Sequence, residues 1–258
     1  MRDIFEEIFL NEPLDPMKSA QRSMRSLLRK RFYEKSTAGK AENGAYSVLL
    51  DGKPVRTPSR NLLAAPAQAL AEAISAEWQA QGEHIDPASM PLTRLSNSII
   101  DGVAVNRKDV AAEVEKYLGS DLVCYRAGQP EGLVARQGEL WDPVLKFAHE
   151  KLGALFLVTK TITYLDQPPG AIASAAAAIP HDIWRLGAVS TITTLTGSAL
   201  LALAVSERFM DGEAAWKASQ ADEDWQFEKW GEDEEALARQ VRRHAEMQAA
   251  VTVLALTA

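Results

Sequence analysis

The sequence contains a single cysteine, Cys124, among its 258 residues. A lone cysteine excludes an internal disulfide framework and a metal site built from several thiolates. We therefore expect Cys124 to be a small, buried apolar residue. The chain has only four histidines, and none has another histidine or a cysteine within helical reach. The sequence thus predicts no zinc site.

The motifs that hold common cofactors or nucleophiles are also missing. The chain has no GxxxxGK[ST] loop and no GxGxxG following a strand, which are the patterns that bind nucleotide phosphates. It has no HExxH pair and no GxSxG elbow, which are typical of zinc proteases and serine hydrolases. We expect no cofactor, no metal and no catalytic residue drawn from these classes.

Long apolar runs are limited to one segment, Ala188 to Val205, which has eighteen residues without a charge. This is the lower limit for a membrane span. Seven of the eighteen residues are Ser, Thr or Gly, and charged residues flank the segment on both sides. We expect a buried helix pair, broken near Thr196-Gly197-Ser198, and a protein that does not span a membrane.

The net charge of −7 comes from one region. Residues 222 to 235 hold eight acids and one lysine, so this stretch alone carries a formal charge of −7 and the rest of the chain is neutral. Such local acidity argues against a nucleic-acid-binding protein. At the other end, acids dominate residues 1 to 16 and bases dominate residues 18 to 35. The acidic start excludes a mitochondrial transit peptide, and the basic block is typical of a solvated arm.

Strand signals lie in the first part of the chain. Tyr46, Val48 and Leu50 alternate with other residues, and Asp51-Gly52 is a strong hairpin turn. A helix is predicted to begin near Pro66. The stretch ALFLVTKTITYL, residues 154 to 165, is rich in β-branched and aromatic residues and predicts a late strand.

Helix signals dominate the second part. The stretch WDPVLKFAHEKLG predicts a helix with Asp142 as its cap, Pro143 in its first turn and Gly153 at its end. A period near 3.6 predicts a final helix, with Asp233 as its cap. The residues that keep this period are Leu237, Val241, His244, Met247, Val251 and Leu254. We expect His244 to be a core histidine with its hydrogen bonds satisfied.

These signals favour the α+β fold class, with a small N-terminal β-containing domain joined to a mainly helical C-terminal domain. The expected boundary lies near residue 100. The N-terminal arm and the α/β domain would then cover residues 1–100, and the helical domain residues 101–258.

The acidic stretch Asp222–Glu235 also carries Trp225 and Trp230, and Gly231 is expected to end one helix before the next begins. In the simplest interpretation the tryptophans pack and the acids cap the last helix. A second hypothesis is a carboxylate-dependent hydrolase with Glu228 and Asp233 as acid and base, although nothing nearby supplies a nucleophile. A third is a surface for a protein partner, since like charges this close repel unless a partner compensates them.

Several segments resemble one family of assembly chaperones, which attends the alpha subunit of the F-type ATP synthase catalytic head. The segments that carry the resemblance are KRFYEKS, YSVLLDGKPVRTP, AEWQAQGEHIDPASMPLTRLSNSIID, SDLVCYRA, WDPVLKFA, GSALLALAV and WQFEKWGEDEEA. They extend from about Arg31 to the end of the chain. The block from Ala76 to Asp101 and the WQ-x-E-x-WGED element are the most specific of them.

The resemblance implies a protein that is not an enzyme. It would bind the newly made alpha subunit, shield the surface that the beta subunit later covers, and prevent aggregation until it is displaced. It implies Glu228 and Asp233 as functional acids, with Glu232 and Glu223 added by proximity, and Trp225 and Trp230 as residues that position the element. It also implies a bacterial cytoplasmic relative of proteins found in the mitochondrial matrix. A monomer suits a one-to-one escort.

Overall fold

A computed structural model describes residues 28–41, 44–161, 163–231 and 233–257 of the chain. Its strands all come from the first part, and they are β1 (Ser36–Lys40), β2 (Tyr46–Leu50), β3 (Lys53–Pro54) and β4 (Ala64–Ala65). They form one antiparallel sheet in the order β1-β2-β3, and β4 also pairs with β2. Asp51 and Gly52 both have positive φ, as a type I′ turn requires, which confirms the predicted hairpin.

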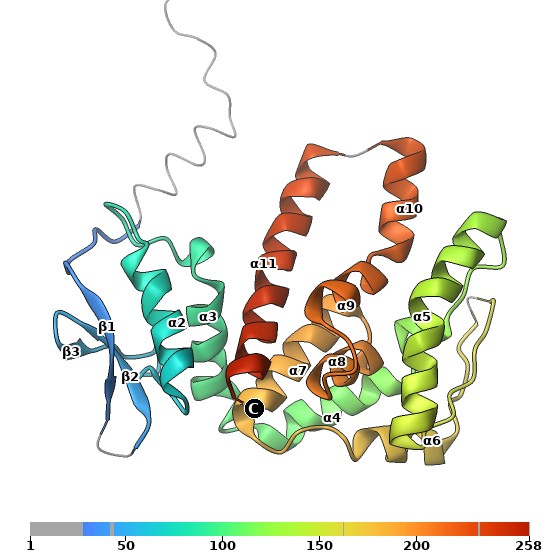
Figure 1. Cartoon of the computed structure of the whole chain (residues 1–258), viewed down its shortest axis with the longest axis horizontal. Coiled ribbons are helices and arrows are strands. Elements are labelled where there is room, and N and C mark those ends of the chain that lie inside the picture. Colours follow the sequence, from blue (N-terminus) through green and yellow to red (C-terminus); the bar gives the residue numbers. More distant parts are fainter. Residues whose placement is uncertain (1–27, 42–43, 162, 232, 258) are drawn as a thin grey trace, which may run out of the picture.

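Helices make up the rest of the fold, and they are α2 (Gln68–Gln79), α3 (Pro91–Ser98), α4 (Arg107–Leu118), α5 (Glu131–Leu152), α6 (Pro169–Ala176), α7 (Ile183–Thr196), α8 (Ala199–Ser206), α9 (Gly212–Ser219), α10 (Ala221–Trp230) and α11 (Glu234–Leu256). Figure 1 shows the sheet and α2 at one end of the molecule and α5 and α6 at the other. The predicted α+β fold class is therefore confirmed.

Two polar contacts fix α2 in the N-terminal part. The hydroxyl of Tyr33 donates to the carbonyl of Trp78 at 2.6 Å, which anchors the chain before β1 to the end of α2. The carboxylate of Glu77 accepts the backbone N–H groups of Leu92 and Thr93, each at 2.7 Å. These are free donors of the first turn of α3, so Glu77 caps a helix from outside it.

The helical core is built around α7 and α8. The chain turns between them at Gly197, which has a φ of 70°, and Ser198 caps α8 by accepting from the N–H of Leu201. Every side chain of α8 is buried, so this apolar run belongs to the core, as predicted. Within the described residues no helix combines the length and apolarity that a membrane crossing needs. The last helix, α11, packs on both α7 and α3 and so links the two parts. The domain boundary near residue 100 stays a prediction.

The predicted helix start at Asp142 is wrong, because α5 runs unbroken from Glu131 to Leu152. Pro143 lies inside this helix, at a cost of about 3 kcal/mol. Burial of Trp141 and Val144 on either side offsets that cost, and the Trp141 indole also donates to a backbone carbonyl at 2.7 Å. The Asp142 carboxylate pairs with Arg126 at 2.9 Å and caps nothing. The predicted helix end at Gly153 is confirmed.

The predicted late strand is also wrong. The described residues between 154 and 165 form one isolated bridge, from Thr159 to Tyr125, and no strand. The backbone N–H and C=O of Leu157 pair instead with the side-chain amide of Gln167. Leu155 and Leu157 are exposed, so their β propensity has no neighbouring strand to pack against.

A buried carboxyl group joins the loop after α4 to the core. Asp121 is fully buried, and it accepts the N–H groups of Val123 at 3.2 Å and Leu200 at 2.9 Å. Burial raises the pKa of Asp121 to about 6, against the opposing effect of these hydrogen bonds. Cys124 beside it is buried, as predicted, and burial raises the pKa of its thiol to about 12.

A candidate client-binding hairpin

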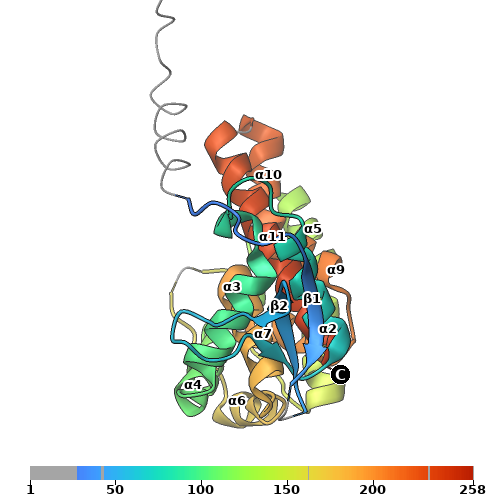
Figure 2. The same ribbon diagram turned by 90° about the vertical axis from the view of Figure 1, so that its left-hand side faces the viewer.

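The acidic stretch folds into a helical hairpin made of α10, the turn at Gly231 and the first half of α11. Gly231 has a φ of 84°, a conformation that favours glycine, so α10 ends where the sequence predicts. Figures 1 and 2 show the two helices projecting together from the body of the molecule. The hairpin therefore presents its turn and the neighbouring helix ends to solvent.

An ion pair that no local sequence pattern indicates attaches the last turn of α10 to α5. A guanidinium nitrogen of Arg136 on α5 donates to both carboxylate oxygens of Glu228, at 2.8 Å each. The same guanidinium lies 5.2 Å from the centre of the Trp225 ring. Glu228 thus already has an internal cationic partner, although its side chain is still half-exposed.

Two further contacts attach α10 to α5. The six-membered ring of Trp225 lies directly over Gly132, where an added Cβ would be only 2.6 Å from a ring carbon. The Gln137 side-chain amide donates to Asp222 at 2.7 Å. Trp225 therefore positions the hairpin through packing, and Gly132 is needed because a larger residue would occupy the same space.

The outer part of the hairpin exposes large apolar side chains. Trp230 is 79% exposed, and Leu237 and Val241, one turn apart on α11, are 43% and 63% exposed. The predicted apolar stripe of α11 therefore continues beyond the part that the core buries, which begins at Met247. An apolar patch on a projecting element is typical of an interaction surface.

Exposed acidic side chains lie at the beginning of both helices of the hairpin. Glu223, Asp233, Glu234 and Glu235 are all exposed, and the side chain of Asp233 makes no capping hydrogen bond although it stands at the cap position of α11. Glu232 lies outside the described residues. We define the hairpin tip as the surface formed by Trp230, Asp233, Leu237 and Val241. It combines apolar area with negative charge, which suits a partner that is apolar and basic.

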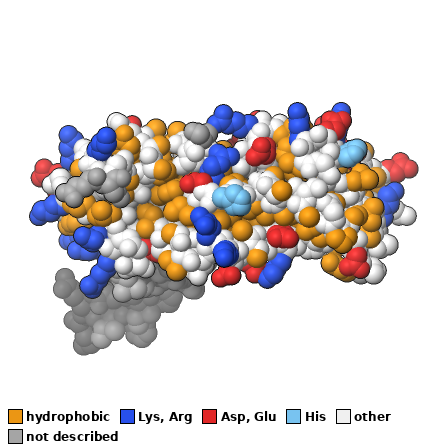
Figure 3. Space-filling view, turned by 90° about the horizontal axis from the view of Figure 1, so that it is seen from below, with side chains coloured by type: hydrophobic (Ala, Val, Ile, Leu, Met, Phe, Trp, Pro, Cys, Tyr) orange, Lys and Arg blue, Asp and Glu red, His pale blue; other side chains and the backbone are white. Residues whose placement is uncertain are grey.

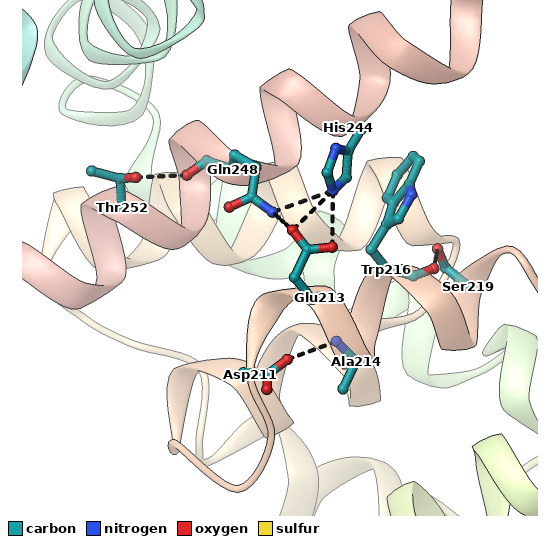
Figure 4. Close-up of polar contacts among 8 residues, drawn as sticks. All are labelled: Asp211, Glu213, Ala214, Trp216, Ser219, His244, Gln248 and Thr252. Atoms are coloured by element: carbon teal, nitrogen blue, oxygen red, sulfur yellow. Dashed lines mark hydrogen bonds and ion pairs between the residues drawn. The ribbon is translucent and has the colours of Figure 1, made fainter. Parts of the chain in front are cut away.

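A separate polar cluster connects α9 to α11, and Figure 4 shows its geometry. Nε2 of His244 lies 3.1 and 3.2 Å from the two carboxylate oxygens of Glu213, and Gln248 donates to the same carboxylate. His244 is satisfied, as predicted, but it is half-buried at the surface and not in the core. The nearby Ser219 and Thr252 hydroxyls donate to backbone carbonyls, so the cluster contains no hydroxyl aimed at the imidazole.

The described residues hold no group of three or more His, Cys, Asp or Glu side chains arranged to bind a metal ion. Among the hairpin acids, Glu228 pairs with Arg136 and Asp222 accepts from Gln137, whereas Glu223 and Asp233 are exposed. This geometry can hold a protein partner by charge and apolar contact.

Comparison with known proteins identifies the chain. The sequence model of the family described as "ATP12 chaperone protein" matches residues 30–149. The crystal structure of Atp12 from Paracoccus denitrificans is 40% identical, has a TM-score of 0.81, and is matched over 89% of this chain and 99% of that one. The chain belongs to the ATP12 chaperone family.

Other ATP12-like proteins agree. A candidate chaperone from Agrobacterium tumefaciens, the Atu1473 protein, is 45% identical with a TM-score of 0.86, over 96% of this chain and 93% of that one. "Protein atp12, mitochondrial" from Schizosaccharomyces pombe is 24% identical over 226 residues, 80% of this chain and 75% of that protein. The predicted family of F-type ATP synthase assembly chaperones is thereby confirmed.

The sequence predicts the hairpin acids as site residues but does not predict the residues of α5 that contact α10. Arg136 is 92 residues from Glu228, and no local pattern links the two. Gly132 carries no signal either, because its role depends on where Trp225 packs. The exposure of Leu237 and Val241 could have been suspected, since they extend a periodic stripe into the acidic stretch.

Proposed function

We propose that this ATP12-family chaperone binds the unassembled alpha subunit of F-type ATP synthase and covers the surface that the beta subunit later occupies. In this role it prevents aggregation of the alpha subunit until the catalytic head assembles. The observation that carries the proposal is the hairpin tip, where Trp230 and two aliphatic side chains are exposed among acids. The bacterial relatives support a bacterial cytoplasmic setting and a chaperone without catalytic turnover.

The chemistry of the tip suits a temporary contact. An unassembled subunit exposes an apolar interface, and such patches aggregate unless they are covered. Trp230 can bury a large area on contact, and tryptophan is among the residues that most often dominate binding energy. The surrounding acids speed association and set orientation, and they contribute little to a permanent seal. The true partner can therefore displace the chaperone.

The roles of the individual acids differ within this proposal. Asp233 and Glu223 are exposed and face the client directly. Glu228 acts from the last turn of α10, where it can exchange Arg136 for a cation of the client. Trp225 positions α10, and Trp230 contacts the client. We assign Glu232 to the client surface from its sequence position only.

The carboxylate-dependent hydrolase receives less support from the same geometry. General acid–base catalysis needs a carboxyl group held in a concave site close to a substrate atom. Glu228 is engaged by Arg136 and half-exposed, and Asp233 lies on the projecting tip. The two acids thus suit recognition of a polypeptide better than conversion of a small molecule.

The first experiment is co-expression with the alpha subunit of the same organism, in a host that lacks its own ATP12 protein. We expect the alpha subunit to move from the pellet to the soluble fraction and to co-purify with the chaperone as a one-to-one complex. Equal amounts of aggregated alpha subunit with and without the chaperone would refute the proposal. The variant Glu115→Lys, a charge reversal on the exposed face of α4, should keep the alpha subunit soluble as well as the wild type does.

A second experiment tests the shielding of the beta-facing surface. The purified complex is mixed with the beta subunit and followed by size-exclusion chromatography. We expect the chaperone to leave as alpha and beta associate. A stable complex that contains all three proteins would show that the chaperone covers some other surface of the alpha subunit.

A further inference from the structure

The N-terminal part carries an apolar groove that the hairpin does not use. It has a volume of about 740 Å³, within the range of pockets that hold ligands. The segment from Leu28 to Tyr33 forms one side, the β2–β3 hairpin another, and Trp78, Ile85 and Pro87 close it. Most of the lining is apolar, so water in the groove is poorly bonded and can be displaced at little cost.

The walls of this groove are fixed in place. Tyr33 is held by its hydrogen bond to Trp78 and by the Arg31 guanidinium, which lies 4.6 Å from its ring centre. The Arg29 guanidinium lies 4.5 Å from the ring centre of Phe32. Phe32 is nevertheless 57% exposed. A large aromatic side chain held in an open apolar groove is a feature of a preformed binding site.

Positive charge lies along the groove. Arg29, Lys53 and Arg56 are exposed lining residues. The acid at the groove, Asp51, accepts the backbone N–H groups of Glu34 and Lys35, so hydrogen bonds within the protein already occupy its carboxylate. Figure 3 looks from the side opposite the hairpin and not into the groove, and it shows further Lys and Arg side chains around hydrophobic surface at the sheet-bearing end of the molecule. The groove suits an acidic and apolar segment.

The chain itself contains such a segment. Residues 3–10 read DIFEEIFL, with three acids among five large apolar residues. Four of the apolar residues fall at positions 4, 5, 8 and 9, a spacing that gives one apolar face to a helix. The described part of the chain begins at Leu28, which is itself a lining residue of the groove. The intervening residues can span up to roughly 60 Å when extended, so reach is no obstacle.

We propose that residues 3–10 dock in the groove between Phe32, the β2–β3 hairpin and Trp78 of the same chain. Ile4, Phe5, Ile8 or Phe9 would fill the apolar floor, and Asp3, Glu6 and Glu7 would face Arg29, Lys53 and Arg56. The tether raises the effective concentration of the segment to about the millimolar range, so weak contacts suffice. The proposal concerns this end of the molecule alone and does not depend on the identity of the client.

The test uses the full chain carrying a nitroxide spin label on Asn11→Cys. Cys124 does not compete for the label, because it is buried and its thiol pKa is raised to about 12. We expect the label to broaden the NMR signal of the Trp78 indole N–H and to leave that of Trp184, buried in the helical part, unchanged. An unbroadened Trp78 signal overturns the proposal.

A pair of charge variants isolates the docking contact. Two exposed ion pairs contribute up to about 1 kcal/mol each, so Glu6→Lys with Glu7→Lys should lower the docked population by roughly tenfold. The matched control, Glu12→Lys with Asp15→Lys, makes the same charge change outside the segment and should retain the broadening. Equal broadening in both double variants would contradict the assigned charge contacts.

The remaining outcomes identify other occupants. Spin-labelled protein at natural isotope abundance is mixed with ¹⁵N protein that carries no spin label. Broadening of Trp78 in that mixture would place the segment in a second copy and overturn the intramolecular proposal. A Trp78 signal that ignores the label but shifts when the alpha subunit is added would show that the groove takes the client instead.

Discussion

One guanidinium nitrogen of Arg136 lies 2.8 Å from each carboxylate oxygen of Glu228 and ties α10 to α5. The two residues come from helices that are distant in the sequence, and their ion pair is one of the contacts that position α10 against α5. Substitution of Glu228 therefore changes two things at once, the charge of the client surface and the attachment of α10.

Charge reversal at both ends of this pair separates the two effects. Glu228→Lys alone places a cation against Arg136 and should destabilise the protein by about 1 kcal/mol or slightly more. Adding Arg136→Glu should restore much of the stability, measured by urea unfolding. We expect alpha-subunit binding to stay low in the double variant, since the surface charge stays reversed. Full recovery of binding would show that Glu228 acts only by holding α10.

Asp233 offers a simpler test, because its side chain makes no capping hydrogen bond. Asp233→Lys should cost less than about 1 kcal/mol of stability, mainly through the helix dipole. It should slow association with the alpha subunit, and the difference from the wild type should shrink at high salt, where charges are screened. Glu115→Lys is the matched control. Identical association rates at low salt would remove Asp233 from the client surface.

Gly132 tests how α10 is seated. An added Cβ would lie 2.6 Å from the Trp225 ring, and its relief requires α10 to shift. We expect Gly132→Ala to destabilise the protein by about 1–3 kcal/mol and to weaken alpha-subunit binding. Gly138→Ala on the same helix is the control, because its Cβ would meet only Asp142, at an ordinary 3.6 Å. If Gly132→Ala is as stable as Gly138→Ala, Trp225 does not fix the hairpin.

Local signals in the sequence predicted the elements that depend on local chemistry. The Asp51-Gly52 turn, the break at Gly197 and the end of α5 at Gly153 each follow from the backbone conformation that one residue allows. The strand predicted over residues 154 to 165 and the helix start predicted at Asp142 were wrong because contacts outside the local pattern decide the structure there. The Gln167 side chain takes the backbone hydrogen bonds of Leu157, and Trp141 is buried and donates to the distant carbonyl of Ala218.

The same distinction applies to the candidate site. The acids were found because eight of them stand together in the sequence. Their geometry was not found, because Arg136, Gly132 and Gln137 come from a helix some ninety residues earlier. A single sequence does not record such pairings. Its composition indicated what kind of surface to expect, and the fold determines which acids are exposed.

Trp230 provides a test in which folding and binding separate. Its side chain is 79% exposed, so Trp230→Ala should change the free energy of unfolding by no more than about 0.5 kcal/mol. If it is an anchor for the client, the same change should weaken alpha-subunit binding by about 2 kcal/mol, or roughly thirtyfold. Phe209, which is also exposed but stacks on Phe147, provides a comparison through Phe209→Ala. Unchanged affinity for the Trp230 variant would exclude Trp230 from the interface.

Asp121 makes stability depend on pH in the direction opposite to most carboxylates. Its pKa is about 6 in the folded protein, against 3.8 as the ordinary value. Between these values the folded state binds more protons than the unfolded state, so the contribution of Asp121 to stability falls as pH rises from about 4 to 6. The full change amounts to about 3 kcal/mol at most.

Asp121→Asn cannot ionise and removes this contribution, which gives a direct measurement. The free energy of unfolding of the wild type minus that of the variant should increase as pH is lowered from 7 to 4. Asp101 provides the opposite case, because desolvation is outweighed by hydrogen bonds from Thr57, Asn61 and Ser59, which together lower its pKa. The corresponding difference for Asp101→Asn should stay nearly constant between pH 7 and about 4 and decrease only at lower pH, because the pKa of Asp101 in the folded protein lies below its ordinary value. Parallel pH profiles for the two variants would show that Asp121 does not retain its proton in the folded protein.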